Sequence, residues 1–119
     1  MNNPLPTPAP AIAINIFTAV AGGIDALIEY QLAEMQAMST EATACGWLGN
    51  EVYLAQDRTR LIVVTRFESL AARERWAATK RFQQHVQALM PLVADITSVP
   101  VTFLAAHGEG AIACVLPHK

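Results

Sequence analysis

The sequence has few charged side chains and no excess of positive charge. Only 15% of its 119 residues are charged, and 8 Lys and Arg stand against 10 Asp and Glu, for a net charge of −2. Without a basic stripe, neither nucleic acid nor an anionic membrane is an expected partner. A small neutral or weakly charged ligand is compatible with this composition.

Cysteine is scarce, and several catalytic motifs are missing. Cys45 and Cys114 are the two cysteines. Disulfide frameworks and zinc sites need more ligands or tighter spacing, so we expect free thiols, a cytoplasmic protein and no bound metal. No glycine-rich phosphate loop or Ser-His-Asp set supports hydrolysis or phosphoryl transfer. The uncharged start of the chain lacks the basic residues of a signal peptide, and Asn15 interrupts its apolar run.

Apolar residues, in contrast, are abundant. They make up 53% of the chain, which is high for a small monomer that buries roughly 65% of its unfolded surface. We therefore expect a homodimer. The proline-rich residues 1–10 are predicted to be a disordered or extended lead, residues 11–107 one folded domain, and residues 108–119 an extension in which "AIACVL" could add a short strand.

Hydrophobic periodicity predicts the order of the elements. Residues 11–20 alternate as a strand does, and the chain from Ile24 carries an apolar helical stripe that leaves Glu34 largely outside; the stripe consists of Ile24, Leu27, Ile28, Leu32 and Met35. Two β-type runs follow, divided by a turn at 56–59. Helical spacing returns from residue 68 until Pro91 bends or ends it, and residues 100–107 are predicted to be the last strand.

This order, β-α-β-β-α-β, is that of an α+β ferredoxin-like fold. Its helices cover one face of the sheet only. The high apolar content predicts that the other face is covered by the same face of a second copy, which gives a homodimer joined through its sheets.

The first strand carries one amide among apolar neighbours. Ile12, Ile14 and Ile16 share one face, which we expect to be core. Asn15 shares the other face with Ala13 and Phe17. Because an alanine and a phenylalanine would be poor choices for a face open to water, this side is predicted to look into an enclosed, half-apolar space.

Three stretches, taken in order, resemble a known family. "INIF" on the first strand, "VYLAQDRTRLIVVTRFES" over the hairpin, and the spacing of Trp76, Phe82 and His85 on the second helix are similar to the antibiotic biosynthesis monooxygenase superfamily of dimeric α+β barrels, over residues 11–106. The resemblance implies two ferredoxin-like subunits with facing sheets and a pocket between each sheet and the second helix region. It also implies oxidation of aromatic polyketides or quinols, or cleavage of heme, generally without flavin or a resident metal.

The resemblance and the side-chain chemistry together suggest a set of site residues. Asn15 would donate a hydrogen bond to a substrate oxygen and His85 would exchange its proton. Phe17, Trp76 and Phe82 would line the pocket that binds the substrate. Nine residues place Trp76 and His85 on opposite sides of a straight helix, so they can share a pocket only if the helix breaks near Thr79 or Lys80.

Arg66 is a further candidate, because its guanidinium could bind an acidic group of the substrate. A salt bridge of Arg66 with Glu68 or Glu51 is an equally compatible interpretation. Quinone-forming relatives carry Asn and Trp four residues apart at the end of the third strand, where this chain has Val63 and Phe67.

Three functions are compatible with these residues. The first is a cofactor-independent monooxygenase that oxidises a small aromatic substrate with O2. The second is a heme-binding or heme-degrading monooxygenase with His85 as the iron ligand. The third is a non-catalytic dimer that binds a small molecule, which the lack of an evident acidic base on the helix faces favours.

Overall fold

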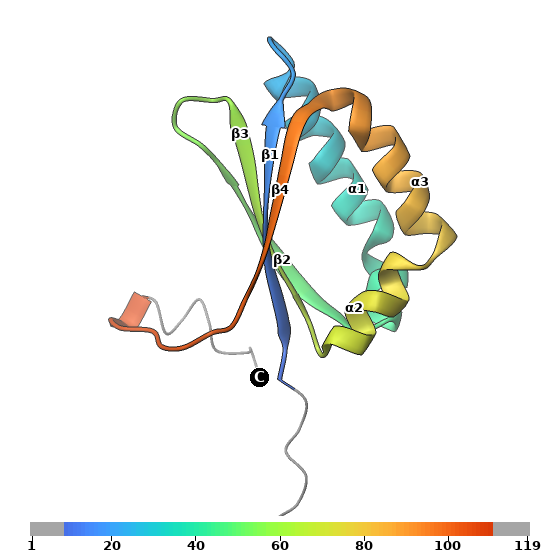
Figure 1. Cartoon of the computed structure of the whole chain (residues 1–119), viewed down its shortest axis with the longest axis vertical. Coiled ribbons are helices and arrows are strands. Elements are labelled where there is room, and N and C mark those ends of the chain that lie inside the picture. The colour runs from blue at the N-terminus through green and yellow to red at the C-terminus, as the bar shows by residue number, and fades with distance from the viewer. Residues whose placement is uncertain (1–8, 111–119) are drawn as a thin grey trace, which may run out of the picture.

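The computed structural model describes residues 9–110, in which three helices cover one face of a four-stranded antiparallel sheet (Figure 1). The elements, in chain order, are β1 (Ala11–Ala19), α1 (Ile24–Ala44), β2 (Trp47–Leu54), β3 (Arg60–Phe67), α2 (Leu70–Ala77), α3 (Lys80–Leu89), a 3₁₀ turn at Met90–Leu92 and β4 (Val93–Val101).

The strand order β2-β3-β1-β4 confirms the predicted ferredoxin-like fold. β1 lies at the centre, where it pairs antiparallel with both β3 and β4. β2 and β3 form the predicted hairpin. In its turn, the carboxylate of Asp57 accepts hydrogen bonds from the backbone N–H and the hydroxyl of Thr59, at 3.1 and 2.7 Å.

The two faces of β1 have opposite surroundings. Ala13 and Phe17 face the helices and are 1% and 7% exposed. Phe17 packs in a core with Leu27 and Val63. The prediction that the isoleucine face is core is therefore wrong for a single chain, because Ile12, Ile14 and Ile16 occupy the face without helices and are only half-buried.

Several sequence-based boundaries and burial assignments need correction. β4 spans Val93–Val101, about seven residues earlier than the predicted last strand, because Pro91 ends the helix and the chain becomes extended at Val93. In α1, Leu32 lies outside the buried stripe and is 49% exposed. Leu27 of the predicted stripe is buried, together with Gln31, Met38 and Ala42, which the prediction did not include.

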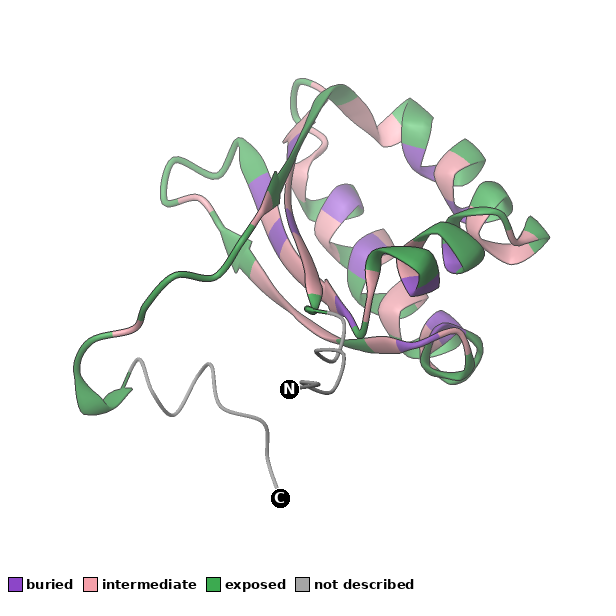
Figure 2. Ribbon diagram, turned by 60° about the horizontal axis from the view of Figure 1, so that its bottom comes forward, coloured by how far each residue is buried: buried purple, intermediate pink, exposed green. Residues whose placement is uncertain are grey.

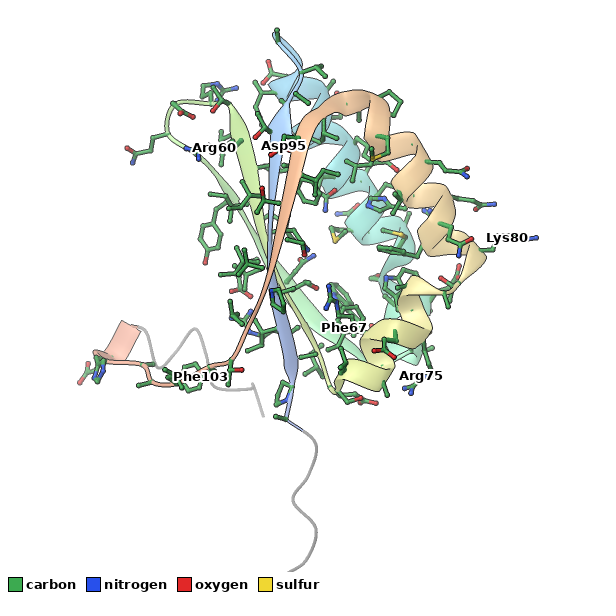
Figure 3. The ribbon with its side chains drawn as sticks, viewed as in Figure 1. Arg60, Phe67, Arg75, Lys80, Asp95 and Phe103 are labelled. Atoms are coloured by element: carbon green, nitrogen blue, oxygen red, sulfur yellow. The ribbon has the colours of Figure 1, made fainter. Side chains whose placement is uncertain are left out.

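After β4 the chain turns away from the sheet on the side opposite the helices (Figures 1 and 2). In this segment Phe103 is 52% exposed and Leu104 is 90% exposed. Figure 3 shows Phe103 on this side and Phe67 on the helix side of the sheet. Exposed apolar side chains thus gather beyond the uncovered face.

Two predicted segments fall outside the described residues. They are the lead at 1–10, of which only residues 9 and 10 are described, and the "AIACVL" strand. Among the helices within residues 9–110, none combines the length and the apolar character that crossing a bilayer requires.

Candidate functional site

A cavity of about 310 Å³ lies between the helix-covered face of the sheet and the helices. Side chains from all four strands and all three helices line it. Its walls are mainly apolar and aromatic, with a few polar groups, as is usual for a small-molecule site. The polar and titratable lining residues are Asn15, Gln31, Ser39, Asn50, Thr65, Arg73, His85 and Ser98.

The cavity opens beside β4. Ile96 and Ser98 of this edge strand line it and are exposed, as is Ala77 at the end of α2. Most of the other lining side chains are buried or half-buried. A ligand can therefore enter between β4 and the junction of α2 with α3.

Asn15 lies on the cavity wall that this opening exposes. Its partner on β4 is Ser98, which faces it in the strand register and donates a hydrogen bond from Oγ to Asn15 Oδ1 at 2.6 Å. The carboxamide nitrogen of Asn15 has no hydrogen bond within residues 9–110. Because Ser98 holds the oxygen, the amide N–H groups are available to an acceptor in the cavity.

His85 is the buried titratable residue of the cavity. Its residue surface is 4% exposed, and its ring stacks on that of Tyr30 at a centroid distance of 5.4 Å. His85 Nδ1 lies 3.1 Å from Glu34 Oε1 and 3.1 Å from the hydroxyl of Tyr30. All hydrogen bonds of the ring in the described part of the chain involve Nδ1, which leaves Nε2 for a ligand.

Glu34 is held in this cluster by Arg81. The guanidinium of Arg81 donates to both carboxylate oxygens of Glu34, at 3.2 and 2.5 Å. The Arg81 hydrogen bonds lower the pKa of Glu34 to about 2, although partial burial acts in the opposite direction. Burial first, and then the Glu34 carboxylate, raise the pKa of Tyr30, which stays a neutral hydroxyl donor. Glu34 is consequently an anion at neutral pH.

These partners determine the state of His85. Burial lowers the pKa of His85 more than the Glu34 carboxylate raises it, so the neutral imidazole is favoured at neutral pH. An ionised carboxylate only accepts hydrogen bonds, so Nδ1 carries the proton and Nε2 the lone pair. The arrangement of carboxylate and imidazole is that of a general base whose tautomer a neighbouring acid fixes.

A break between α2 and α3 lets Trp76 and His85 line the same cavity. α2 ends at Ala77, and α3 begins at Lys80. Thr79 joins the two helices, because its hydroxyl donates to the Trp76 carbonyl at 2.7 Å and accepts from the Phe82 N–H at 3.2 Å. The rings of Trp76 and Phe82 then meet edge to face at 5.9 Å. The helix is therefore broken, as the spacing of Trp76 and His85 requires if both are to line one cavity.

Arg66 is the one proposed site residue that lies elsewhere. It faces Ile12 across the strand pair, on the side of the sheet without helices, and forms a salt bridge with Glu51. The prediction that Arg66 binds substrate in this cavity is therefore wrong for a single chain. The remaining candidates all line the cavity; they are Asn15, Phe17, Trp76, Phe82 and His85.

Sequence reasoning missed three residues that α1 contributes. Glu34, which the apolar stripe leaves on the solvent side, has a side chain only 16% exposed and supplies the acidic group expected to be absent. Tyr30, one turn before it, lies against His85. Gln31 is 2% exposed and lines the cavity. Its position four residues after Leu27 and four before Met35 was the available signal.

No group of three or more His, Cys, Asp or Glu side chains suited to a metal ion occurs within residues 9–110. A single nitrogen, Nε2 of His85, is oriented for coordination by the bonds of Nδ1 described above.

No protein-family model and no curated protein matches the sequence. Solved structures do match the fold. A proposed antibiotic biosynthesis monooxygenase of Bacteroides thetaiotaomicron has a TM-score of 0.70 at 13% identity, over 85% of this chain and 95% of its own. A second proposed monooxygenase of this kind, from Deinococcus radiodurans, has a TM-score of 0.67 at 20% identity, over 82% of this chain and 96% of its own. A third, from Nitrosomonas europaea, has a TM-score of 0.69 at 12% identity, over 85% of this chain and 96% of its own.

These similarities confirm that the chain has the fold of antibiotic biosynthesis monooxygenases. They extend over nearly the full length of the compared structures. Because a fold hosts many chemistries, what this chain does must be argued from its own site.

Proposed function

We propose that this chain is a cofactor-independent monooxygenase that oxidises a small aromatic substrate with O2. The observation that carries the proposal is His85, buried in the cavity wall with Nδ1 bound to Glu34 and Nε2 left for a substrate. The monooxygenase fold of the solved structures supports it. An aromatic hydroxyl or its keto tautomer is the substrate class that these groups can activate.

The proposed reaction begins with proton transfer. His85 Nε2 takes a proton from the substrate, and the resulting electron-rich anion gives one electron to O2. Recombination forms a carbon–oxygen bond, and loss of water breaks the oxygen–oxygen bond. A ring methylene and O2 thereby become a ring carbonyl and water, so no external reductant is needed. The N–H groups of Asn15 stabilise the developing negative oxygen, and the apolar walls exclude water.

The cavity size favours this reading over heme cleavage. At about 310 Å³ it lies at the lower end of the range for small-molecule sites, roughly 300 to 1,000 Å³. A fused aromatic ring system suits this volume better than a tetrapyrrole does. Trp76 and Phe82 offer flat walls for such rings.

We further propose a homodimer joined through the uncovered sheet face. This face carries Ile12, Ile14 and Ile16, and Val99 beside them is 43% exposed. The segment that follows β4 runs on the same side of the sheet (Figure 1), and its Phe103 and Leu104 are exposed. A stable dimer of this kind would bury on the order of 2,000 Å² or more of largely apolar surface.

Oxygen consumption tests the proposed activity. Purified protein is mixed with menadiol or an anthrone, O2 uptake is followed with an electrode, and the products are identified by mass spectrometry with labelled O2. We expect uptake above the uncatalysed rate, and with the anthrone, whose ring methylene becomes a carbonyl, one labelled oxygen atom in the product. Absence of catalysed uptake with both substrate types, together with a Soret shift on addition of hemin, would instead assign the cavity to heme.

A further inference from the structure

Gln31 is a buried polar side chain that the fold does not explain. It occupies an inward position of α1 among Leu27, Met38 and Ala42, and it is 2% exposed. Its carbonyl oxygen, Oε1, is the one buried side-chain nitrogen or oxygen within residues 9–110 that has no hydrogen-bond partner. The same side chain lines the cavity.

An unpaired buried acceptor is costly to a folded protein. Leu or Met at this position would continue the apolar stripe of α1 without that cost. Stability therefore gives no reason for the carboxamide. A hydrogen-bond donor that arrives with the ligand would satisfy it.

The position of Gln31 relative to His85 narrows the choice of ligand. Gln31 and Glu34 are three residues apart on α1, which corresponds to about 4.5 Å along the helix axis. Glu34 in turn holds His85 Nδ1 at 3.1 Å. One turn of α1 thus carries both the unpaired acceptor, Gln31, and the carboxylate that holds the proposed base, His85. Gln31 and His85 both line one small cavity.

We propose that Gln31 Oε1 accepts a hydrogen bond from a second hydroxyl of the ligand, so that the site selects dihydroxylated aromatics over monohydroxylated ones. This inference rests on the proposed function, because the first hydroxyl is the one that meets His85. Gln31 is then a specificity-determining residue, and its role is in binding rather than in proton transfer.

Calorimetric titration in oxygen-free buffer tests this proposal without turnover. The probes are a naphthalenediol and its monomethyl ether, which share a ring system and differ by one donor. The variants are Gln31→Met, which keeps the length of the side chain and removes the acceptor, and Gln36→Met as the matched control. Gln36 is exposed on the same helix.

We expect the wild type and Gln36→Met to bind the diol about tenfold more tightly than the ether, the scale of one buried hydrogen bond. Gln31→Met should bind both probes equally, and its melting temperature should equal or exceed that of the wild type. A preference for the diol that survives in Gln31→Met would overturn the proposal. So would equal binding of the two probes by the wild type, or failure of both Gln31→Met and Gln31→Leu to fold.

A parallel measurement separates this proposal from the proposed function. If the wild type binds the diol with a preference that depends on Gln31 but consumes no O2 with any aromatic substrate, the specificity site stands and the oxidation does not. If the wild type oxidises the diol while its binding is indifferent to Gln31, the oxidation stands and the specificity site does not.

Discussion

The two faces of the sheet differ in how far their apolar residues are buried within a single chain. On the helix side, Phe17 and Val63 are buried at 7% and 3% exposure, and polar groups such as Asn15 are admitted only where they line the cavity. On the other side, Ile14 and Val64 face each other in the strand register yet stay half-buried. One face completes its core within the chain, whereas the other has an apolar surface that remains to be covered.

This contrast assigns different tasks to the two faces. Substitutions on the covered face should change binding and turnover, because the cavity and His85 lie there. Substitutions on the uncovered face should change the association of two copies of the chain, because no helix within residues 9–110 of a single chain packs against that face (Figure 1). Substitutions on each face test this division.

Ile14→Asp should abolish the proposed dimer. It places a charge in the middle of the uncovered face, beside Val64 and Val99 in the register, where an apolar interface cannot solvate it. Sedimentation velocity should show a species of one chain, 12.8 kDa, or loss of folding. Gln87→Asp on the exposed side of α3 should stay dimeric. A wild type that sediments as a monomer at micromolar concentration would contradict the account of this face.

His85→Gln should lower turnover by about 10²- to 10⁴-fold, the usual contribution of a general base. The fold should persist, because glutamine retains some polar contacts of the site. Steady-state O2 uptake measures the effect, and circular dichroism checks the fold. His107→Gln is the matched control, since His107 is exposed. Equal losses in both variants would remove His85 from the mechanism.

Asn15→Ala should lower turnover by about 10²-fold, the scale of losing one donor to a developing oxyanion. Fold and dimer should stay nearly intact, because the hydrogen bond lost within the protein is the one from Ser98, at an exposed edge. If the variant instead loses about 1 to 3 kcal/mol of stability with unchanged specific activity, Asn15 is a structural amide. Ser98→Ala, which removes only this partner, should have a smaller effect on turnover.

Glu34→Gln should destabilise the folded chain by about 2 kcal/mol at pH 7, because Arg81 and His85 lose a charged partner. The folded-state pKa of Glu34 lies at about 2, below its ordinary 4.5. Its contribution is therefore complete above pH 4.5 and is lost as the pH falls from 4.5 towards 2. Urea unfolding at pH 7 and at pH 3 should show a smaller difference from wild type at the lower pH. Exposed Glu29→Gln should show little change at either, and a pH-independent loss in Glu34→Gln would contradict this origin.

Local pattern was enough to predict the fold class, and most of the candidate residues that it suggested line the cavity. Alternation and helical spacing indicated the β-α-β-β-α-β order. The spacing of Trp76 and His85 set only a condition, a helix break near Thr79 or Lys80, and the structure meets it. Alternation is symmetric, however, and cannot tell which face of β1 the helices cover. The edge strand β4 was misplaced because Asp95, Thr97 and Ser98 give it little apolar alternation.

The His85 cluster could not be predicted because its partners are distant in sequence. Tyr30 and His85 are 55 residues apart, and Glu34 and Arg81 are 47 residues apart. Only the packing of α1 against α3 brings them together. Gln31 differs from these, because a polar residue inside the apolar stripe of a helix is visible in the sequence itself.

The pH dependence of kcat/KM for O2-dependent oxidation tests the role of His85 most directly. Because a base must be neutral to act and burial lowers the pKa of His85 from its ordinary 6.5, kcat/KM of the wild type should rise with pH along a limb centred below 6.5 and then level off. His85→Gln should lack this limb. A variant that keeps the same limb as the wild type would contradict the assignment of His85 as the base.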